Sequence, residues 1–253
     1  MTTRTILLTG ATGKFGKLLS RHFVGLGDTV IGTARSGEAL ECLVKTLNGG
    51  NRSFIGIVSD LAASGGVERL VAELASRSLH PDCLINNARS LEYLNVQDNG
   101  IVSRENFVNE YILDVVVPYE LTMLLAKQAD SHLTKVVNIG SQYGSVAANP
   151  SLYDDPERQS PIHYSVAKAG LVHLTRELAV RLANKKVQIN CVAFGGVEGR
   201  VDEAFRQKYA KLCPMGRMLT EDELAGPVEI LLSVHSHGIT GHTLMADGGW
   251  SLW

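Results

Sequence analysis

Short apolar runs alternate with longer amphipathic segments along almost the whole chain. Seven runs are too short for helices, and most are bounded by Gly, Asn, Asp or Ser, so each predicts a buried strand. The segments between them have helical spacing; in one, leucines at 171, 174, 178 and 182 recur at steps of three and four residues. We predict strands at Ile6–Leu8, Thr29–Thr33, Phe54–Val58, Cys83–Ile85, Val136–Ile139, Val187–Val192 and Thr243–Ala246, and helices at about Lys17–Leu26, Glu38–Leu47, Gly66–Ser76, Phe107–Ser131, Tyr164–Leu182 and Glu221–Ser233.

This order of elements predicts the fold. Strands that are apolar throughout and are each followed by a helix form right-handed βαβ units, in which helices cover both faces of a parallel sheet. We therefore predict an α/β fold with a doubly wound, parallel, seven-stranded sheet in a single domain over residues 1–253. The segment Asn149–Pro161 differs in texture, because it is rich in Pro, Asp, Ser and Glu, and predicts an irregular surface loop.

Composition narrows the classes of function. The formal charge is −2, and no block of like charge points to nucleic acid or an anionic membrane as partner. No apolar run approaches the ~20 residues of a membrane span, and the first residues lack the apolar region of a signal peptide. The four cysteines are far apart and predict neither disulfides nor a metal site. We expect a soluble, cytoplasmic protein with a small-molecule substrate.

A glycine-rich turn joins the first predicted strand to the first helix. Its sequence is Thr9-Gly10-Ala11-Thr12-Gly13-Lys14-Phe15-Gly16. Glycines here let the backbone approach a pyrophosphate, and the helix N-terminus adds unpaired N–H groups and a positive dipole. Such a turn can also be merely tight, but its place after the first strand of a βαβαβ run favours a dinucleotide site.

The end of the second strand bears on which dinucleotide binds. An acid that holds the ribose 2′-hydroxyl is usual there for NAD, whereas NADP sites use a base. Here no carboxylate precedes Glu38, and Arg35 could meet a 2′-phosphate, with Lys14 as a second cation. We predict a preference for NADP(H), with NAD(H) as the alternative if Arg35 is only an exposed loop residue.

A tyrosine, a lysine and a serine suggest the chemistry. Tyr164 and Lys168 are four residues apart on one helical face, so the ammonium can lie near the phenol and favour the phenolate form. Such a phenol can act as general acid or base on a carbonyl/alcohol pair. Ser141 follows the fifth strand, at the edge where open α/β sheets bind ligands.

With these residues the chain resembles a short-chain dehydrogenase/reductase over nearly its whole length. No single motif is decisive, but seven in the right order are specific. They are Thr9-Gly10, Asp60, Asn86-Asn87-Ala88, Ser141, Tyr164 with Lys168, the run from Ile189 to Gly195, and Asp247-Gly248-Gly249.

The resemblance implies a Rossmann fold, a nicotinamide cofactor and three catalytic roles. Ser141 would orient the substrate carbonyl, Tyr164 would protonate its oxygen, and Lys168 would hold the nicotinamide ribose. It also implies a dimer or homotetramer that associates through the helices at about 107–131 and 164–182. The cofactor-binding residues expected from the turn and the resemblance are Gly10, Thr12, Gly13, Lys14, Phe15, Gly16, Arg35, Asp60, Leu61, Asn87, Ala88, Tyr164, Lys168, Gly195 and Val197, with Asp60 on the adenine and Asn86–Ala88 along the adenosine ribose.

Several residues depart from the family pattern. Lys14 replaces the usual middle glycine, so the glycine spacing is that of the extended branch, whose members often handle nucleotide sugars. Arg89 replaces a glycine, Phe194 replaces a proline, and Asp114 stands where an asparagine often supports a proton-relay water. We therefore count Asp114 as a fourth candidate catalytic residue.

An insertion of about ten residues lies within 147–162, between Ser141 and Tyr164. It could form a lid or wall for a polar substrate, or remain a solvated loop. Gly196–Pro214 is expected to be a mobile substrate loop, with further charged residues that favour a polar substrate. His163 is expected to pack or cap rather than touch substrate. The insertion residues that favour a polar substrate are Tyr153, Asp154, Asp155, Glu157 and Arg158.

The functional hypothesis is an NAD(P)-dependent oxidoreductase that interconverts a ketone and a secondary alcohol on a small polar, for example sugar-like, molecule. One alternative is a non-catalytic nucleotide-binding sensor or partner subunit, motivated by Lys14, Arg89 and Asp114. Another is a sugar-nucleotide epimerase or dehydratase, motivated by the glycine spacing and the insertion.

Overall fold

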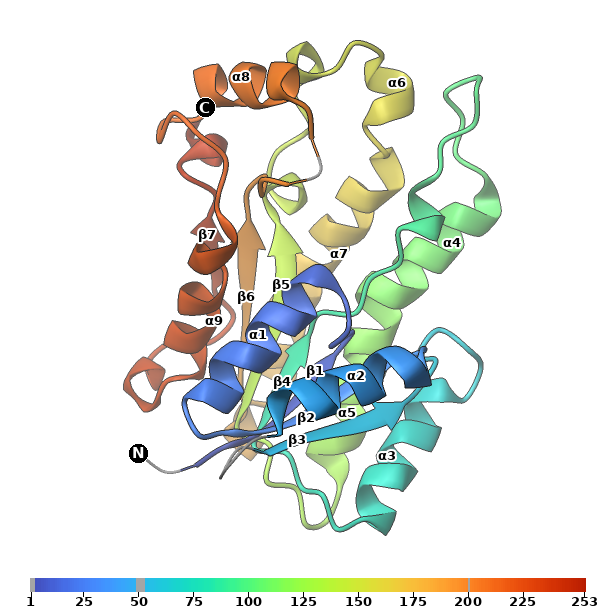
Figure 1. Cartoon of the computed structure of the whole chain (residues 1–253). Helices are drawn as coiled ribbons and strands as arrows, with labels where there is room; N and C mark the ends of the chain where they lie inside the picture. The colour runs from blue at the N-terminus through green and yellow to red at the C-terminus, as the bar shows by residue number, and fades with distance from the viewer. Residues whose placement is uncertain (1–2, 49–52, 200) are drawn as a thin grey trace.

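The computed structural model describes residues 3–48, 53–199 and 201–253 (Figure 1). Its core is a seven-stranded sheet in the order β3-β2-β1-β4-β5-β6-β7, with every neighbouring pair parallel. This confirms the predicted fold class, and each predicted strand lies within two residues of the observed one at both ends. The strands are β1 Thr5–Thr9, β2 Thr29–Ala34, β3 Ser53–Val58, β4 Cys83–Asn86, β5 Lys135–Ser141, β6 Gln188–Phe194 and β7 Thr243–Ala246.

Helices cover both faces of the sheet. Successive strand residues alternate between two apolar cores: Ile6 and Leu8 of β1 pack with one set of helices, and Leu7 packs with the other. Because both faces are buried, the strands carry apolar residues at successive positions. The first set is α1 Lys14–Gly25, α2 Gly37–Leu47 and α9 Ala225–Leu232; the second is α3 Gly66–Ser76, α5 Val117–Lys127 and α7 Ile162–Arg181.

The strand order reverses between β1 and β4, which creates the functional edge of the sheet. The chain winds outward from β1 to β3, then crosses back to place β4 on the other side of β1. Loops that leave the carboxyl ends of β1 and β4 therefore run in opposite directions and leave a crevice between them, where open α/β sheets bind their ligands.

The long helix predicted at Phe107–Ser131 is not α-helical throughout. It consists of α4 Arg104–Tyr111, a π-helical turn at Ile112–Val116, and α5. Pro118 explains the interruption, because it has no N–H to donate to the carbonyl of Asp114 and its ring would crowd that carbonyl. The wider turn instead lets the N–H of Val117 donate to the carbonyl of Ile112. Asp114 lies within this turn.

Two segments that were predicted as loops contain helices. Within Gly196–Pro214 lies α8 Glu203–Leu212, whose first turn is capped by Asp202, and the insertion contains α6 Pro156–Gln159. Both lie beyond the carboxyl ends of β5 and β6 (Figure 1). Arg200, in the same predicted loop, lies outside the described residues. The predicted helix at Glu221–Ser233 is a short 3-10 turn followed by α9. The 3-10 turns are Glu92–Leu94, Gln142–Gly144, Pro150–Leu152, Ala183–Lys185, Glu221–Glu223, Val234–Ser236 and Trp250–Leu252.

Among the described residues, no helix is both long enough and apolar enough to cross a membrane. The four cysteines are free thiols: Cys42 is exposed, and Cys83, Cys191 and Cys213 are buried.

Candidate active site

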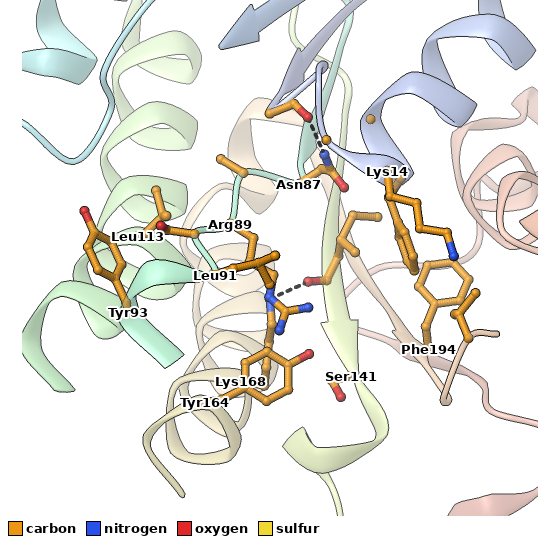
Figure 2. Close-up of a pocket in the computed structure, with 18 of the residues that line it drawn as sticks. Lys14, Asn87, Arg89, Leu91, Tyr93, Leu113, Ser141, Tyr164, Lys168 and Phe194 are labelled. Atoms are coloured by element: carbon orange, nitrogen blue, oxygen red, sulfur yellow. Dashed lines mark hydrogen bonds between the residues drawn. The ribbon is translucent and has the colours of Figure 1, made fainter. Parts of the chain in front are cut away.

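A cleft of about 640 Å³ runs along the carboxyl ends of the strands, from β3 to the segments beyond β6. The residues predicted to bind cofactor line it, except Asn86, and so does Ser141. Asn86 is buried at the end of β4, and Asp114 lies behind Lys168. Figure 2 shows Tyr164, Lys168 and Arg89 together, with Ser141 beside them and Lys14 near Phe194.

The glycine turn at the start of α1 has the shape of a cradle for phosphate. Gly10 has a φ of +67°, and a Cβ there would lie 2.8 Å from Cα of Ala88. A Cβ on Gly16 would overlap the carbonyl oxygen of Gly10. The N-terminus of α1 has no side-chain cap and no acid in its first turn, so its N–H groups are free for an anion. These residues fit the pyrophosphate of a dinucleotide.

Thr9 and Asn87 fasten this turn to the end of β4. The hydroxyl of Thr9 accepts hydrogen bonds from the backbone N–H groups of Asn87 and Ala88, both at 2.9 Å. In return the amide of Asn87 donates to the carbonyls of Thr9 and Gly10, at 2.9 and 3.2 Å. Both side chains therefore hold the cradle in shape, which is a structural reason for the Thr-Gly and Asn-Asn-Ala motifs.

The two cations that were predicted to meet a 2′-phosphate lie on different sides of the cleft. Arg35, at the end of β2, is half exposed, and its only ion pair within the described chain is with the exposed Glu92, at 3.6 Å. The ammonium of Lys14 instead donates to the carbonyl of Glu198 at 2.6 Å and pairs with Glu221 at 3.0 Å. Lys14 thus points towards the segment after β6, and Arg35 alone stands at the expected place.

Ser141 and Tyr164 face the same part of the cleft. Ser141 is the last residue of β5, and its Oγ accepts the N–H of Tyr143 at 3.2 Å, which leaves its own hydroxyl hydrogen free to donate. Tyr164 is in the first turn of α7. The guanidinium carbon of Arg89 lies 4.8 Å from the centre of the Tyr164 ring, closer than Nζ of Lys168 at 5.7 Å. Arg89 is thus a part of the site that sequence reasoning noted only as a departure.

Lys168 is buried and held in place by two groups. Its ammonium donates to Oδ1 of Asp114 at 3.1 Å and to the carbonyl of Ile139 at 2.9 Å. One N–H remains for a group in the cleft. Burial by itself would lower the pKa of Lys168, but the negative charge of Asp114 outweighs it and holds the pKa above its usual value. Lys168 therefore stays positively charged.

Glu110, one turn before Asp114, adds a second buried carboxyl group behind the site. Only 1% of its surface is exposed, and neither carboxyl oxygen has a hydrogen-bond partner among the described residues. Burial, and next the charge of Asp114, raise its pKa to about 7. Sequence analysis missed Glu110; its signal is an acid at a core-facing position, four residues before Asp114.

The far end of the cleft is lined by five side chains that we call the aromatic wall: Tyr143, Tyr153, Phe205, Tyr209 and Met218. They come from the 3-10 turn after β5, the insertion, α8 and the segment after it. Four of them were not predicted, because Gly196–Pro214 was taken as a loop and the Gln142–Gly144 turn was not recognised. The spacing of Phe205 and Tyr209, one helical turn apart after the N-cap Asp202, was the available signal.

The insertion does not supply a polar wall to the cleft. Tyr153 is its only residue that lines the cleft among those described. Asp154 pairs with Lys208 at 2.6 Å and Arg158 with Asp98 at 2.8 Å, both at the surface. Charged side chains favour water unless they are paired inside, so they turn outward. Of the two alternatives that the sequence left open for these residues, the solvated surface segment fits their positions better than a polar wall. Buried His163, which contacts the carbonyl of Tyr93 at 2.6 Å, packs as expected.

Comparison with known proteins gives one family and many relatives. The family described as enoyl-(acyl carrier protein) reductase matches residues 10–251. A 3-oxoacyl-(acyl-carrier-protein) reductase from Aquifex aeolicus is 28% identical over 96% of this chain and 95% of its own length. An uncharacterized short-chain type dehydrogenase/reductase from Sinorhizobium fredii is 28% identical over 98% of this chain, which spans less than half (43%) of that relative.

Two solved structures have the same fold. A short chain dehydrogenase from Leptospira borgpetersenii with bound NAD⁺ superposes with a TM-score of 0.82, at 24% identity, and covers 99% of this chain and 94% of its own. A variant of the actinorhodin polyketide ketoreductase with NADPH superposes with a TM-score of 0.83, at 23% identity, and covers 99% and 98%.

Proposed function

Because the chain belongs to the short-chain dehydrogenase/reductase family, and so is an NAD(P)-dependent oxidoreductase, we propose that it reduces a ketone to a secondary alcohol with NADPH and catalyses the reverse oxidation. The observation that carries the proposal is the grouping of Ser141, Tyr164 and Lys168 at one end of a cleft whose other end is a phosphate cradle. A nicotinamide dinucleotide bound in such a cleft can place its pyrophosphate on the cradle and its nicotinamide ring beside these three residues.

The proposed mechanism divides the work between two hydroxyl groups. When bound, the nicotinamide supplies the hydride. Ser141 donates its free hydroxyl hydrogen to the carbonyl oxygen and fixes its position. Tyr164 donates its phenolic proton to the same oxygen as negative charge develops there. In the oxidative direction Tyr164 takes the proton back from the alcohol.

Lys168 and Asp114, buried next to Tyr164, position the cofactor and place positive charge near the phenol. The Lys168 ammonium, held by Asp114 and the carbonyl of Ile139, keeps one N–H for the ribose of the cofactor and places positive charge near Tyr164. We propose that Asp114 acts as a positioning residue, since its carboxylate fixes Lys168 directly. This role differs from that of the asparagine in the family pattern, which supports a proton-relay water.

We propose NADPH as the preferred cofactor because Arg35 lies at the end of β2 with only a weak surface pair to Glu92. A guanidinium forms strong, bidentate hydrogen bonds with phosphate. Solved relatives hold NAD⁺ in one case and NADPH in another, so the preference needs its own test. In a thermal-shift titration with NAD⁺, NADH, NADP⁺ and NADPH, a ligand that binds only the folded protein raises the Tm according to its affinity. We expect the NADP pair to give the larger shift; the reverse order would contradict the role of Arg35.

The direct test follows NADPH oxidation at 340 nm with a panel of ketones. Turnover of any ketone that needs Tyr164 supports the proposal. Binding of NADPH without any turnover would favour the sensor or partner subunit, and a tightly retained NAD(H) that survives purification would favour an epimerase or dehydratase.

Relatives named as a 3-oxoacyl reductase and a ketoreductase support carbonyl reduction as the reaction. The small polar substrate and the cytoplasmic location stay predictions.

We also propose self-association through α4, α5 and α7. Apolar and aromatic side chains stand exposed on these helices, among them Phe107, Tyr111, Tyr119 and Val166. An exposed apolar patch of this kind is typical of a protein interface. Light scattering coupled to size-exclusion chromatography is expected to give the mass of a dimer or tetramer; a mass near 27.3 kDa would contradict this.

A further inference from the structure

The phenol hydroxyls of the aromatic wall already have hydrogen-bond partners within the protein. The hydroxyls of Tyr143 and Tyr153 share a hydrogen bond of 3.1 Å. The hydroxyl of Tyr209 donates to the amide oxygen of Gln142 at 3.1 Å and accepts the N–H of Gly196 at 2.9 Å. A substrate group that lies on the wall therefore finds few free hydrogen-bonding partners there; the polar groups that face it are Ser141, Tyr164 and Arg89, at the catalytic end of the cleft.

The wall is also uncharged at neutral pH. Burial, and next the neighbouring Tyr153, raise the pKa of Tyr143 above its usual range. Burial likewise raises the pKa of Tyr209 to about 12. Both phenols thus stay protonated. At the surface, Asp154 pairs with Lys208 of α8, and Arg158 pairs with Asp98 and Asp155.

The rings are arranged to pack against one another and leave faces and edges towards the cleft. Tyr153 and Phe205 are tilted by 57° with their centres 5.8 Å apart, and Phe205 and Tyr209 follow at 6.5 Å. Tyr209 is stacked at 4.3 Å on Trp250, which fixes it from behind. A Cβ on Gly196 would lie 2.8 Å from the Tyr209 ring, so glycine is required for this close packing. The ring positions in the wall are therefore fixed by packing.

These contacts determine which class of substrate gains binding free energy from the wall. A polyhydroxylated ketone would exchange hydrogen bonds to water for contact with aromatic faces, and each hydroxyl left without a partner costs binding free energy. A flat apolar group instead buries its surface against the wall and stacks at the usual ring distances of about 4.5–7 Å.

We propose that the substrate is a ketone with an aromatic ring, or a comparable flat apolar group, close to the carbonyl carbon, and that Phe205 and Tyr153 select it. This inference rests on the proposed function for its chemistry and is the alternative to the small polar, sugar-like substrate that the sequence suggested. The group would lie on the aromatic wall while the carbonyl oxygen faces Ser141 and Tyr164.

The test compares three kinds of ketone on the wild-type enzyme with NADPH. They are an aryl ketone such as 1-tetralone, a small apolar ketone such as butanone, and a polyhydroxylated ketone such as erythrulose. We expect kcat/KM to be highest for the aryl ketone and lowest for erythrulose. A preference for erythrulose would overturn the inference.

Two variants tie the preference to the wall. Phe205→Ala is expected to lower kcat/KM for 1-tetralone by about tenfold, mainly through KM, and for butanone by less than about twofold. Tyr153→Phe keeps the ring and is expected to stay within about threefold of wild type. An equal loss for both ketones in Phe205→Ala, or a Tyr153→Phe loss as large as that of Phe205→Ala, would contradict selection by ring contact.

Controls separate folding and function from substrate choice. Ile230→Ala removes an exposed apolar side chain on α9 and is expected to leave kcat/KM unchanged for both 1-tetralone and butanone. Thermal melts and NADPH titration check that each variant folds and binds cofactor. If no ketone is turned over, the proposed function fails, but saturation-transfer NMR still tests whether the wall binds an aryl group. Weaker binding of 1-tetralone to Phe205→Ala than to wild type would support the inference. Absence of binding to wild type would contradict it.

Discussion

The cofactor half of the cleft and its catalytic half use different parts of the chain. The cofactor half, at the ends of β1 to β3, consists mainly of backbone: glycines, free N–H groups and a turn fastened by Thr9 and Asn87. The catalytic half, at the ends of β4 to β6, consists of side chains, several of them ionisable and buried, such as Lys168, Asp114 and Glu110. Backbone recognition spreads its free energy over many small contacts, whereas buried charges concentrate it. Single substitutions should therefore have large effects in the catalytic half and small ones in the cofactor half.

Tyr164→Phe should have the largest effect and should separate the two halves. Removal of the phenolic hydroxyl takes away the general acid, so kcat is expected to fall by about 10²–10⁴-fold. The Kd for NADPH should stay within about threefold, because the phosphate cradle is untouched. Steady-state rates and a fluorescence titration measure the two quantities on the same sample. Thr46→Val, which also removes a hydroxyl but at an exposed position of α2, is the control. A near-wild-type rate in Tyr164→Phe would remove Tyr164 from the mechanism.

Asp114→Asn tests the buried ion pair of the catalytic half. The substitution leaves the Lys168 ammonium buried without its counter-charge, and loss of one partner of such a pair typically costs about 3 kcal/mol. Denaturant unfolding should show this loss. The comparison is Asp98→Asn, which breaks the exposed pair with Arg158 and should cost less than about 1 kcal/mol. Equal losses in the two variants would mean that the Asp114–Lys168 pair is no more important than a surface pair.

Glu110→Gln tests the second buried carboxyl group through pH. Burial and Asp114 raise the pKa of Glu110 from about 4.5 to about 7 in the folded protein. Between these values the folded protein keeps a proton that the unfolded chain has released, so the free energy of unfolding decreases as pH rises and levels off above about 7. The decrease should reach up to ~3 kcal/mol in wild type and be absent in Glu110→Gln.

Urea unfolding at a series of pH values from 4.5 to 8 measures this difference. Glu105→Gln, at an exposed position of the same helix, should follow the wild-type curve. If Glu110→Gln and wild type run parallel across this range, Glu110 does not hold a proton in the folded protein.

Arg35→Ser should give the smallest effect and belongs to the cofactor half. Loss of the guanidinium should weaken NADPH binding about tenfold, which is ~1.4 kcal/mol, and leave NADH binding unchanged. Calorimetric titration gives the ratio of the Kd values for NADPH and NADH in wild type and in the variant. Arg21→Ser, on the exposed side of α1, is the control. A loss of equal size for both nucleotides would show that Arg35 does not read the 2′-phosphate.

The same contrast explains what could be predicted from the sequence. The strands and the glycine turn follow from local patterns of apolar residues and glycine, so both were recovered, and the residues predicted for the cofactor line the cleft. The π-helical turn was missed because Pro118 changes hydrogen bonding without disturbing the apolar pattern around it. Glu110 was missed because a helix reads as amphipathic even with one acid on its inner face.

The aromatic wall could not be predicted because it exists only in three dimensions. Tyr143, Tyr153 and Phe205 belong to separate segments that meet only when β5, the insertion and α8 come together. The charges that surround Tyr153 in the sequence suggested a polar site, yet they pair with Lys208 and Asp98 at the surface. Composition of a loop therefore did not indicate which of its side chains face the cleft.

The most direct test of carbonyl reduction follows the hydride itself. The enzyme is incubated with NADPH deuterated at both C4 positions and an aryl ketone, and the product is analysed by mass spectrometry. We predict that wild type gives a secondary alcohol with a single deuterium on the carbinol carbon and that Tyr164→Phe gives little or none. No alcohol, or an alcohol without deuterium, would contradict it.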